Sequence, residues 1–177
     1  MGVSQTDPMK TPEGFTPIKD LPFQLGTGRP QFRDSAFNLQ MFSKQDEKKM
    51  WGVIQFKDNF MGPPGHTHGG AQAYILDEAM GTLCWDCGFP VVAKSIQIEF
   101  KKSAPLHEDL VVTAEIEKKE IDHLVVTSTL MTESGRVFAT GSGVFHLLSY
   151  AQFSQLFSDR SYDMSRWFPE LKKSSIP

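Results

Sequence analysis

The pattern of hydrophobic and polar positions divides the chain into a proline-rich start, a hairpin, one helix and a run of long strands. Five of the eleven prolines fall within the first thirty residues. Because proline removes a backbone donor and fixes φ, this stretch is expected to be neither a helix nor a central strand. We interpret residues 1–34 as an arm lying over the domain, with four candidates to dock it: Phe15, Leu21, Phe23 and Leu25.

A hairpin and a helix are predicted next. Two β-type segments, 35–42 and 50–60, are joined by the charged turn SKQDEKK. After a loop that contains GPPG, residues 69–85 consist mostly of good helix formers without proline. At about 100° per residue the apolar side chains centre on one face. They are Ala73, Leu76, Ala79, Met80 and Leu83. Further apolar residues widen this stripe, which predicts a helix buried on most sides.

From residue 91 onward the pattern becomes that of long strands. VVAKSIQIEF alternates Ile96, Ile98 and Phe100 with polar residues, which is the period of a half-buried strand. Three segments rich in Val, Thr and Phe follow: DLVVTAEIEKKE, HLVVTSTLMT and RVFATGSGVFHLL. We expect four antiparallel strands in a meander. One helix followed by these strands predicts an α+β fold, an antiparallel sheet wrapped around a central helix.

The length of 177 residues suits one domain with appendages. The core is expected at 35–148, followed by a partly helical C-terminal extension at 149–177. Fourteen of the aromatic residues are phenylalanine. Those outside the core are candidates to cover a pocket, to contact another subunit or to pad the outer sheet: Phe15, Phe23, Phe153, Phe157 and Phe168.

Composition and charge narrow the class of protein. Hydrophobic residues make up 40% and charged residues 22%, which is a globular composition. The net charge is -3 and no basic run exceeds two residues, so nucleic-acid binding is not expected. Two cysteines are too few for a disulfide framework, and neither a signal-peptide pattern nor an apolar run of about 20 residues occurs. We expect a cytoplasmic protein that does not bind membranes.

Asp77 and Glu78 lie in the middle of the mostly apolar helix. Adjacent helix residues point in different directions, and the helical wheel puts Asp77 at the edge of the apolar stripe and Glu78 opposite its centre. Burial would raise the pKa of a carboxyl group at such an edge towards the range that suits a general base. In the alternative interpretation both side chains simply face solvent.

Histidines and glycines precede the helix in the string GPPGHTHGG, residues 62–70. A His66-x-His68 pair is a metal-binding pattern of cupins, but no third ligand follows at the required spacing. The single CxxC of Cys84 and Cys87 has no second pair, so neither a metal nor a cofactor is expected. Glycines at a helix start instead expose backbone N–H groups, the donors of an oxyanion hole.

The motif His68-Gly69-Gly70, the nine-residue step to Asp77 and the string FKKSAPL together resemble the hotdog-fold acyl-CoA thioesterases. GPPGxxHGG is most similar to the branch that contains mammalian thioesterase superfamily members 4 and 5. Bacterial phenylacetate-pathway thioesterases are more distant relatives. The resemblance covers about residues 50–148 and implies hydrolysis of an acyl-CoA, or of a related acyl thioester, to carboxylate and thiol.

This resemblance also assigns roles to residues. It implies that Asp77 is the general base or nucleophile and that the Gly69 backbone N–H, with Gly70, polarises the thioester carbonyl. His68 would orient the loop, and Glu78 is a second choice of base. Lys101 and its neighbour Lys102 would lie near the phosphates of coenzyme A.

One position departs from the family pattern. Where mammalian members have Ser or Thr to position water, this chain has Ala93. Ser95, two residues on, is expected on the same face of the strand and is the candidate substitute.

Family members are dimers or tetramers whose sites combine residues of two chains, so a homodimer or homotetramer is implied. A non-catalytic acyl-CoA-binding or ligand-sensing hotdog protein is the alternative, which the missing hydroxyl at position 93 favours. A hotdog dehydratase and a cupin-like metal protein rank below it. Acyl chain length and the choice between coenzyme A and acyl-carrier protein stay open.

Overall fold

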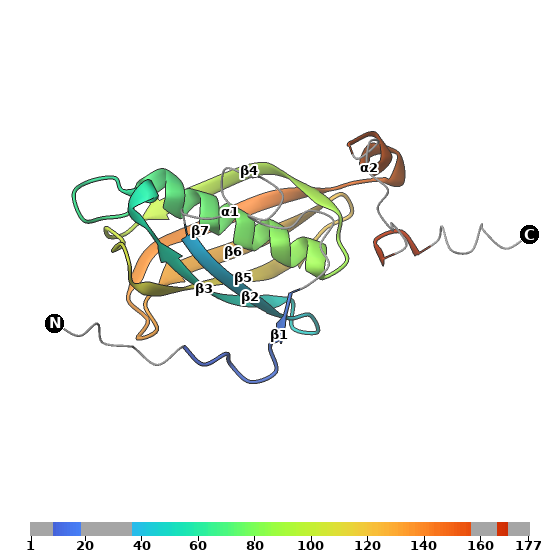
Figure 1. Cartoon of the computed structure of the whole chain (residues 1–177). Coiled ribbons are helices and arrows are strands. Elements are labelled where there is room, and N and C mark those ends of the chain that lie inside the picture. Colours follow the sequence, from blue (N-terminus) through green and yellow to red (C-terminus); the bar gives the residue numbers. More distant parts are fainter. Residues whose placement is uncertain (1–8, 19–36, 157–165, 170–177) are drawn as a thin grey trace, which may run out of the picture.

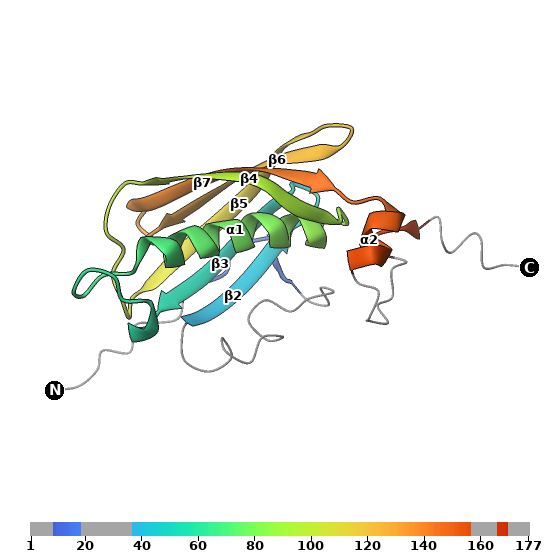
Figure 2. The ribbon, with the colours of Figure 1, turned by 90° about the horizontal axis from the view of Figure 1, so that it is seen from above.

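Ten elements make up the described part of the computed structural model, which comprises residues 9–18, 37–156 and 166–169. They are β1 (Thr16–Pro17), β2 (Phe37–Lys44), β3 (Lys49–Phe56), the 3-10 helix η2 (Asp58–Phe60), α1 (Gly69–Asp86), β4 (Val91–Phe100), β5 (Asp109–Lys119), β6 (His123–Met131), β7 (Val137–Leu147) and α2 (Tyr150–Leu156). The strands form one antiparallel sheet in the order β1-β2-β3-β5-β6-β7-β4. The sheet curls around α1, as Figures 1 and 2 show. The predicted α+β architecture, with one helix held by an antiparallel sheet, is confirmed.

The helix follows its predicted bounds closely, since α1 ends at Asp86, one residue later than expected. Its sheet-facing sides are buried, and the remaining positions form a half-buried stripe. This stripe consists of Ala73, Tyr74, Asp77, Glu78 and Gly81. Four of the five residues predicted for the apolar face are buried, whereas Ala73 is only half-buried. Because the apolar stripe is so broad, the sequence pattern did not show which of its edges faces the sheet.

The predicted four-strand meander is only partly right. Strands β5, β6 and β7 follow one another as expected, whereas β4 joins the far edge of the sheet beside β7. Because no described strand continues the sheet beyond β4, this strand is much more exposed than its alternation predicted. Ile96 is 42% exposed and Phe100 54% exposed.

The described part of the C-terminal extension packs at the end of α1. Phe153 of α2 is completely buried and Phe168 nearly so, and their rings lie edge to face, 5.4 Å apart. In the arm, Phe15 lines a groove with Trp51 of β3. The other predicted docking and covering residues, Leu21, Phe23, Leu25 and Phe157, lie outside the described residues.

Candidate active site

The loop before α1 is fastened to the segment that follows β4. Thr67 donates its backbone N–H to the Ala104 carbonyl at 2.8 Å and its hydroxyl to the Pro105 carbonyl at 2.9 Å. His66 forms a β-bridge with Pro105. Gly62 passes so near His68 that a Cβ atom there would lie 2.8 Å from the His68 Cα. The GPPGHTHGG and SAPL strings are thus parts of one structural unit.

His68 is the N-cap of α1. Its Nδ1 accepts the Gly70 N–H at 2.9 Å, and its carbonyl accepts the N–H groups of Ala71 and Gln72. Among the described residues, none accepts a hydrogen bond from the Gly69 N–H. Since helix N-termini carry a partial positive charge, Gly69 offers a donor for an oxyanion, whereas the Gly70 donor is occupied.

Phe100 and two lysines lie near this helix start. A Cβ atom on Gly69 would be 3.4 Å from the Phe100 ring, so the end of β4 adjoins the N-terminus of α1. The N–H groups of Lys101 and Lys102 both donate to the Phe138 carbonyl, and both side chains are exposed. Lys101 forms an ion pair with Glu99. Lys101 and Lys102 therefore come directly after the end of β4, which borders Gly69.

Asp77 lies two turns further along α1 and is half-buried. Burial raises the pKa of its carboxyl group above the ordinary aspartate value. The side chain borders a pocket of about 140 Å³ between α1 and strands β4 and β7. The lining residues are Asp77, Glu78, Gly81, Thr82, Trp85, Val91, Ala93 and Phe145. This carboxylate is thus held where loss of water favours its proton-accepting chemistry.

Position 93 lies in the same pocket as Asp77, but Ser95 does not. A β-bulge between Ala93 and Ser95 lets Ala93 pair with Phe145 and Ser95 with the adjacent Val144. Because neighbouring residues of β7 point to opposite faces, the two positions of β4 also face opposite ways. The expectation that Ser95 shares the face of position 93 is wrong. The inserted residue of the bulge reverses the alternation.

The candidate oxyanion donor and the candidate base are far apart within one chain. Gly69 and Asp77 are eight residues apart in a continuous helix, which corresponds to about 12 Å along its axis. A reacting carbonyl has to lie about 3 Å from both groups. One chain therefore does not bring these two groups to a single carbonyl.

Metal and thiol chemistry have little support here. Within the described ranges no three His, Cys, Asp or Glu side chains are grouped so that they could hold a metal ion. Cys84 is buried, which raises the pKa of its thiol strongly, and burial raises that of Cys87 to about 11. Thiols that stay protonated at neutral pH are poor nucleophiles.

The chain matches known proteins over this region. The sequence profile of the thioesterase superfamily matches residues 64–139, which include the capped helix start and Asp77. Over these residues the chain is similar to the thioesterase superfamily. Acyl-coenzyme A thioesterase THEM5 of Mus musculus is 28% identical over 83% of this chain and 60% of its own length. THEM4 of Rattus norvegicus is 30% identical over 59% of this chain and 45% of its own length. The chain thus spans about half the length of these relatives.

Two solved structures share the fold of this chain. The PaaI protein of the Escherichia coli phenylacetic acid degradation operon superposes with a TM-score of 0.57 at 17% identity, covering 64% of this chain and 80% of its own. A hypothetical thioesterase protein of Streptococcus pneumoniae, solved with coenzyme A, gives 0.59 at 16% identity over 63% of this chain and 90% of its own. The predicted hotdog fold is confirmed.

Two residues that line the Asp77 pocket escaped the sequence prediction. Gly81 and Trp85 follow Asp77 at intervals of four residues, and both border its pocket. The helical spacing from Asp77 was a usable signal for both. The sequence analysis missed them because Trp85 counted as one more apolar residue of the helix and Gly81 has no side chain.

Proposed function

We propose that this protein is an acyl-CoA thioesterase, a hydrolase that converts an acyl-CoA and water to a free carboxylate and coenzyme A. The observation that carries the proposal is the half-buried Asp77 with its raised pKa beside a pocket in a thioesterase superfamily domain. A related acyl thioester, such as one on acyl-carrier protein, would undergo the same reaction.

In the proposed reaction, Asp77 accepts a proton from water while the water oxygen bonds to the thioester carbonyl carbon. The Gly69 N–H donates to the carbonyl oxygen as negative charge develops there. The C–S bond then breaks, and the leaving thiolate takes up the proton. In the alternative mechanism, the Asp77 carboxylate itself attacks the carbonyl carbon and displaces the thiolate, and water then hydrolyses the resulting anhydride.

Supporting roles fall to the residues around these two groups. His68 caps α1 and thereby fixes the helix start that presents the Gly69 N–H. We also propose that Lys101 and Lys102 bind phosphate groups of coenzyme A, because both side chains are exposed and follow Phe100, whose ring borders Gly69. No role is proposed for Ser95 at the water, because it faces away from the Asp77 pocket.

The proposal is tested by the thiol released from a panel of acyl-CoAs. We expect Asp77→Asn to lower kcat by about 10²–10⁴-fold, the usual contribution of a general base. Glu78→Gln is the matched control, since it changes the adjacent carboxylate in the same pocket and should keep most of the activity. Full activity of Asp77→Asn would contradict the mechanism.

We propose further that the protein is a homodimer or homotetramer with active sites built from two chains. The separation of Gly69 and Asp77 along α1 supports this, because a second chain could supply the missing partner to each. Strand β4 also ends the described sheet and leaves Ile96 and Phe100 largely exposed, as an edge that accepts another chain does.

Mixing inactive variants tests the two-chain site. Gly69→Pro removes the N–H at the first helical position, where proline is tolerated, and His68 before it already has the extended conformation that precedes proline. We expect this variant alone to lose about 10²–10³-fold in kcat. Mixed with Asp77→Asn after unfolding and refolding, it should recover about a quarter of the wild-type activity through hybrid dimers. Sites contained within one chain would show no recovery.

A non-catalytic acyl-CoA-binding or ligand-sensing protein is the second candidate, because Ala93 lacks the hydroxyl that positions water in mammalian relatives. Calorimetry that shows tight binding of acyl-CoA without release of thiol would favour it.

The location that we propose is the cytoplasm. Both cysteines are free thiols, as expected in a reducing compartment. No helix of the described residues is long and apolar enough to cross a membrane.

A further inference from the structure

The pocket beside Asp77 extends along α1 towards the C-terminal end of the helix. Asp77, Gly81 and Trp85 are spaced four residues apart and so follow one side of the helix, with Trp85 about 12 Å beyond Asp77. The opposite wall is apolar and comes from Val91 and Phe145, among others. A thioester carbonyl at Asp77 would therefore direct its acyl group past Gly81 towards Trp85.

Gly81 provides the space in the middle of this path. It lies inside a regular helix and does not have a positive φ, so the backbone does not require glycine here. A Cβ atom at this position would lie 3.8 Å from the Phe145 ring, in ordinary van der Waals contact. Alanine would thus fit the fold without strain and would fill part of the pocket. The path stays open at this point because glycine has no side chain.

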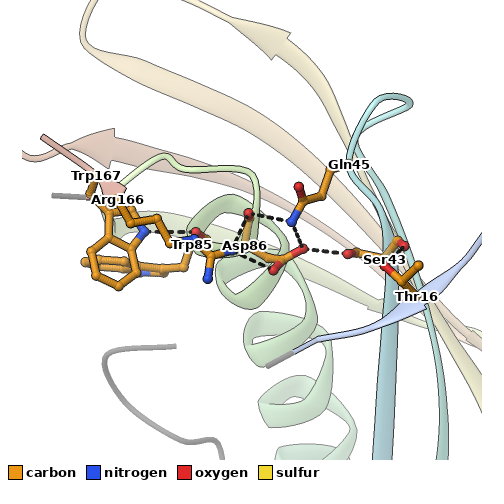
Figure 3. A network of polar contacts seen from close by, with 7 residues as sticks. All are labelled: Thr16, Ser43, Gln45, Trp85, Asp86, Arg166 and Trp167. Carbon is orange, nitrogen blue, oxygen red and sulfur yellow. Dashed lines mark hydrogen bonds and ion pairs between the residues drawn. The ribbon is translucent and has the colours of Figure 1, made fainter. Parts of the chain in front are cut away.

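Trp85 closes the far end of the path and is held there by the C-terminal extension. Its ring lies 5.6 Å from that of Trp167 and 5.8 Å from that of Phe153. Trp167 also donates its indole N–H to the Trp85 carbonyl at 3.0 Å. Figure 3 shows Trp85 and Trp167 with this hydrogen bond, beside the polar network of the next residue, Asp86.

Asp86 fixes the backbone next to Trp85. Its buried carboxylate accepts hydrogen bonds from Ser43 and Gln45 on one side and from Arg166, at 3.0 Å, on the other. Gln45 and Arg166 also donate to the Asp86 carbonyl. Strand β2 and the turn after it thus hold the end of α1 together with the extension. A tryptophan packed and tied in this way cannot swing aside for a longer ligand without breaking these contacts.

We propose that Gly81 and Trp85 limit the size of the acyl group, and that the C-terminal extension sets this limit by holding Trp85 in place. The inference rests on the proposed thioesterase function. A cavity of about 150 Å³ holds one benzene ring, so a pocket of about 140 Å³ suits a compact acyl group, a short chain or a single ring. Long-chain acyl groups would meet the Trp85 ring.

Values of kcat/KM for straight-chain acyl-CoAs from acetyl to palmitoyl test this proposal. For the wild type we expect a preference for short chains. Trp85→Leu should raise the ratio of long-chain to short-chain kcat/KM by about tenfold or more, the discrimination typical of one or two methylene groups in a pocket. Trp51→Leu, which changes a tryptophan of β3 outside the pocket, is the matched control and should keep the wild-type preference.

Gly81→Ala keeps the test decisive if Trp85→Leu folds poorly, because it removes no packing and favours the helix. It should shift the preference to still shorter acyl groups by about tenfold. Trp167→Leu should shift it towards longer ones, in the same direction as Trp85→Leu. If Gly81→Ala and Trp85→Leu both keep the wild-type chain-length preference, the proposed size limit is wrong. If Trp167→Leu keeps the wild-type preference, the C-terminal extension does not set the limit. If the wild type hydrolyses no acyl-CoA at all, the proposed function itself fails.

Discussion

Phe153 belongs to α2, in the C-terminal extension, and yet its side chain is completely buried. Its ring lies 5.4 Å from Phe168, 5.8 Å from Trp85 and 6.3 Å from Trp167, measured between centroids. Replacing Phe153 by alanine removes the ring at the centre of this cluster. The extension then loses its largest anchor on α1.

The expected loss of stability follows from this burial. Truncating a buried phenylalanine to alanine typically costs about 3–5 kcal/mol, which includes the cavity left behind. Each aromatic pair contributes about 0.5–1.5 kcal/mol beyond its buried area, and Phe153 makes three such pairs. We therefore expect Phe153→Ala to lower the free energy of unfolding by about 3–5 kcal/mol. For a chain of this length the melting temperature would fall by about 6–20 °C.

Guanidinium unfolding followed by tryptophan fluorescence measures this change, since Trp85 and Trp167 lie in the same cluster. Leu156→Ala is the matched control on the same helix, because its side chain is 58% exposed and the loss should stay within about 0.5 kcal/mol. If Phe153→Ala costs no more than Leu156→Ala, the extension is not packed on α1 and cannot hold Trp85.

Three further predictions concern the candidate active site. Burial raises the folded-state pKa of Asp77, so stability falls as the pH rises from the pKa of an unfolded aspartate through the folded-state pKa. Asp77→Asn should therefore raise the melting temperature at pH 7, and the gain should vanish below the pKa of an unfolded aspartate, near pH 4; an equal gain at both pH values would refute this. His68→Ala removes the cap of α1 and should cost about 0.5–2 kcal/mol in urea unfolding, whereas His68→Asn, which keeps an acceptor, should recover most of it. Ala93→Ser places a hydroxyl in the Asp77 pocket and should raise kcat by about 2–10-fold, the worth of one hydrogen bond. Its control, Ser95→Ala, should leave kcat unchanged, because Ser95 faces the other side of the sheet; a large loss would contradict the orientation that the bulge gives to Ser95.

Local signals in the sequence were enough to find the elements. The alternation of VVAKSIQIEF predicted β4 with its observed bounds, and the proline-free run after GPPGHTHGG predicted α1 to within one residue. Both signals come from short-range periodicity, which the backbone geometry of strands and helices imposes directly. The motif and the step to Asp77 likewise pointed to the helix start and to the carboxylate, because their spacing along one helix does not depend on the rest of the fold.

Short-range periodicity could not predict contacts between segments that are far apart in the sequence. The place of β4 at the sheet edge depends on long-range pairing with β7, and the bulge that turns Ser95 away is a feature of that pairing. Likewise, the choice of His68 Nδ1 as acceptor for Gly70 depends on the cap geometry.

The sequence by itself thus determined the elements, the fold class and the chemical groups, since each follows from residue type and local spacing. The tertiary structure alone decided which groups share a pocket. It placed Ala93, Gly81 and Trp85 with Asp77, and it brought Trp167 from 82 residues away onto the end of α1. Packing of side chains from several elements creates such a pocket, and no single segment of the chain contains that information.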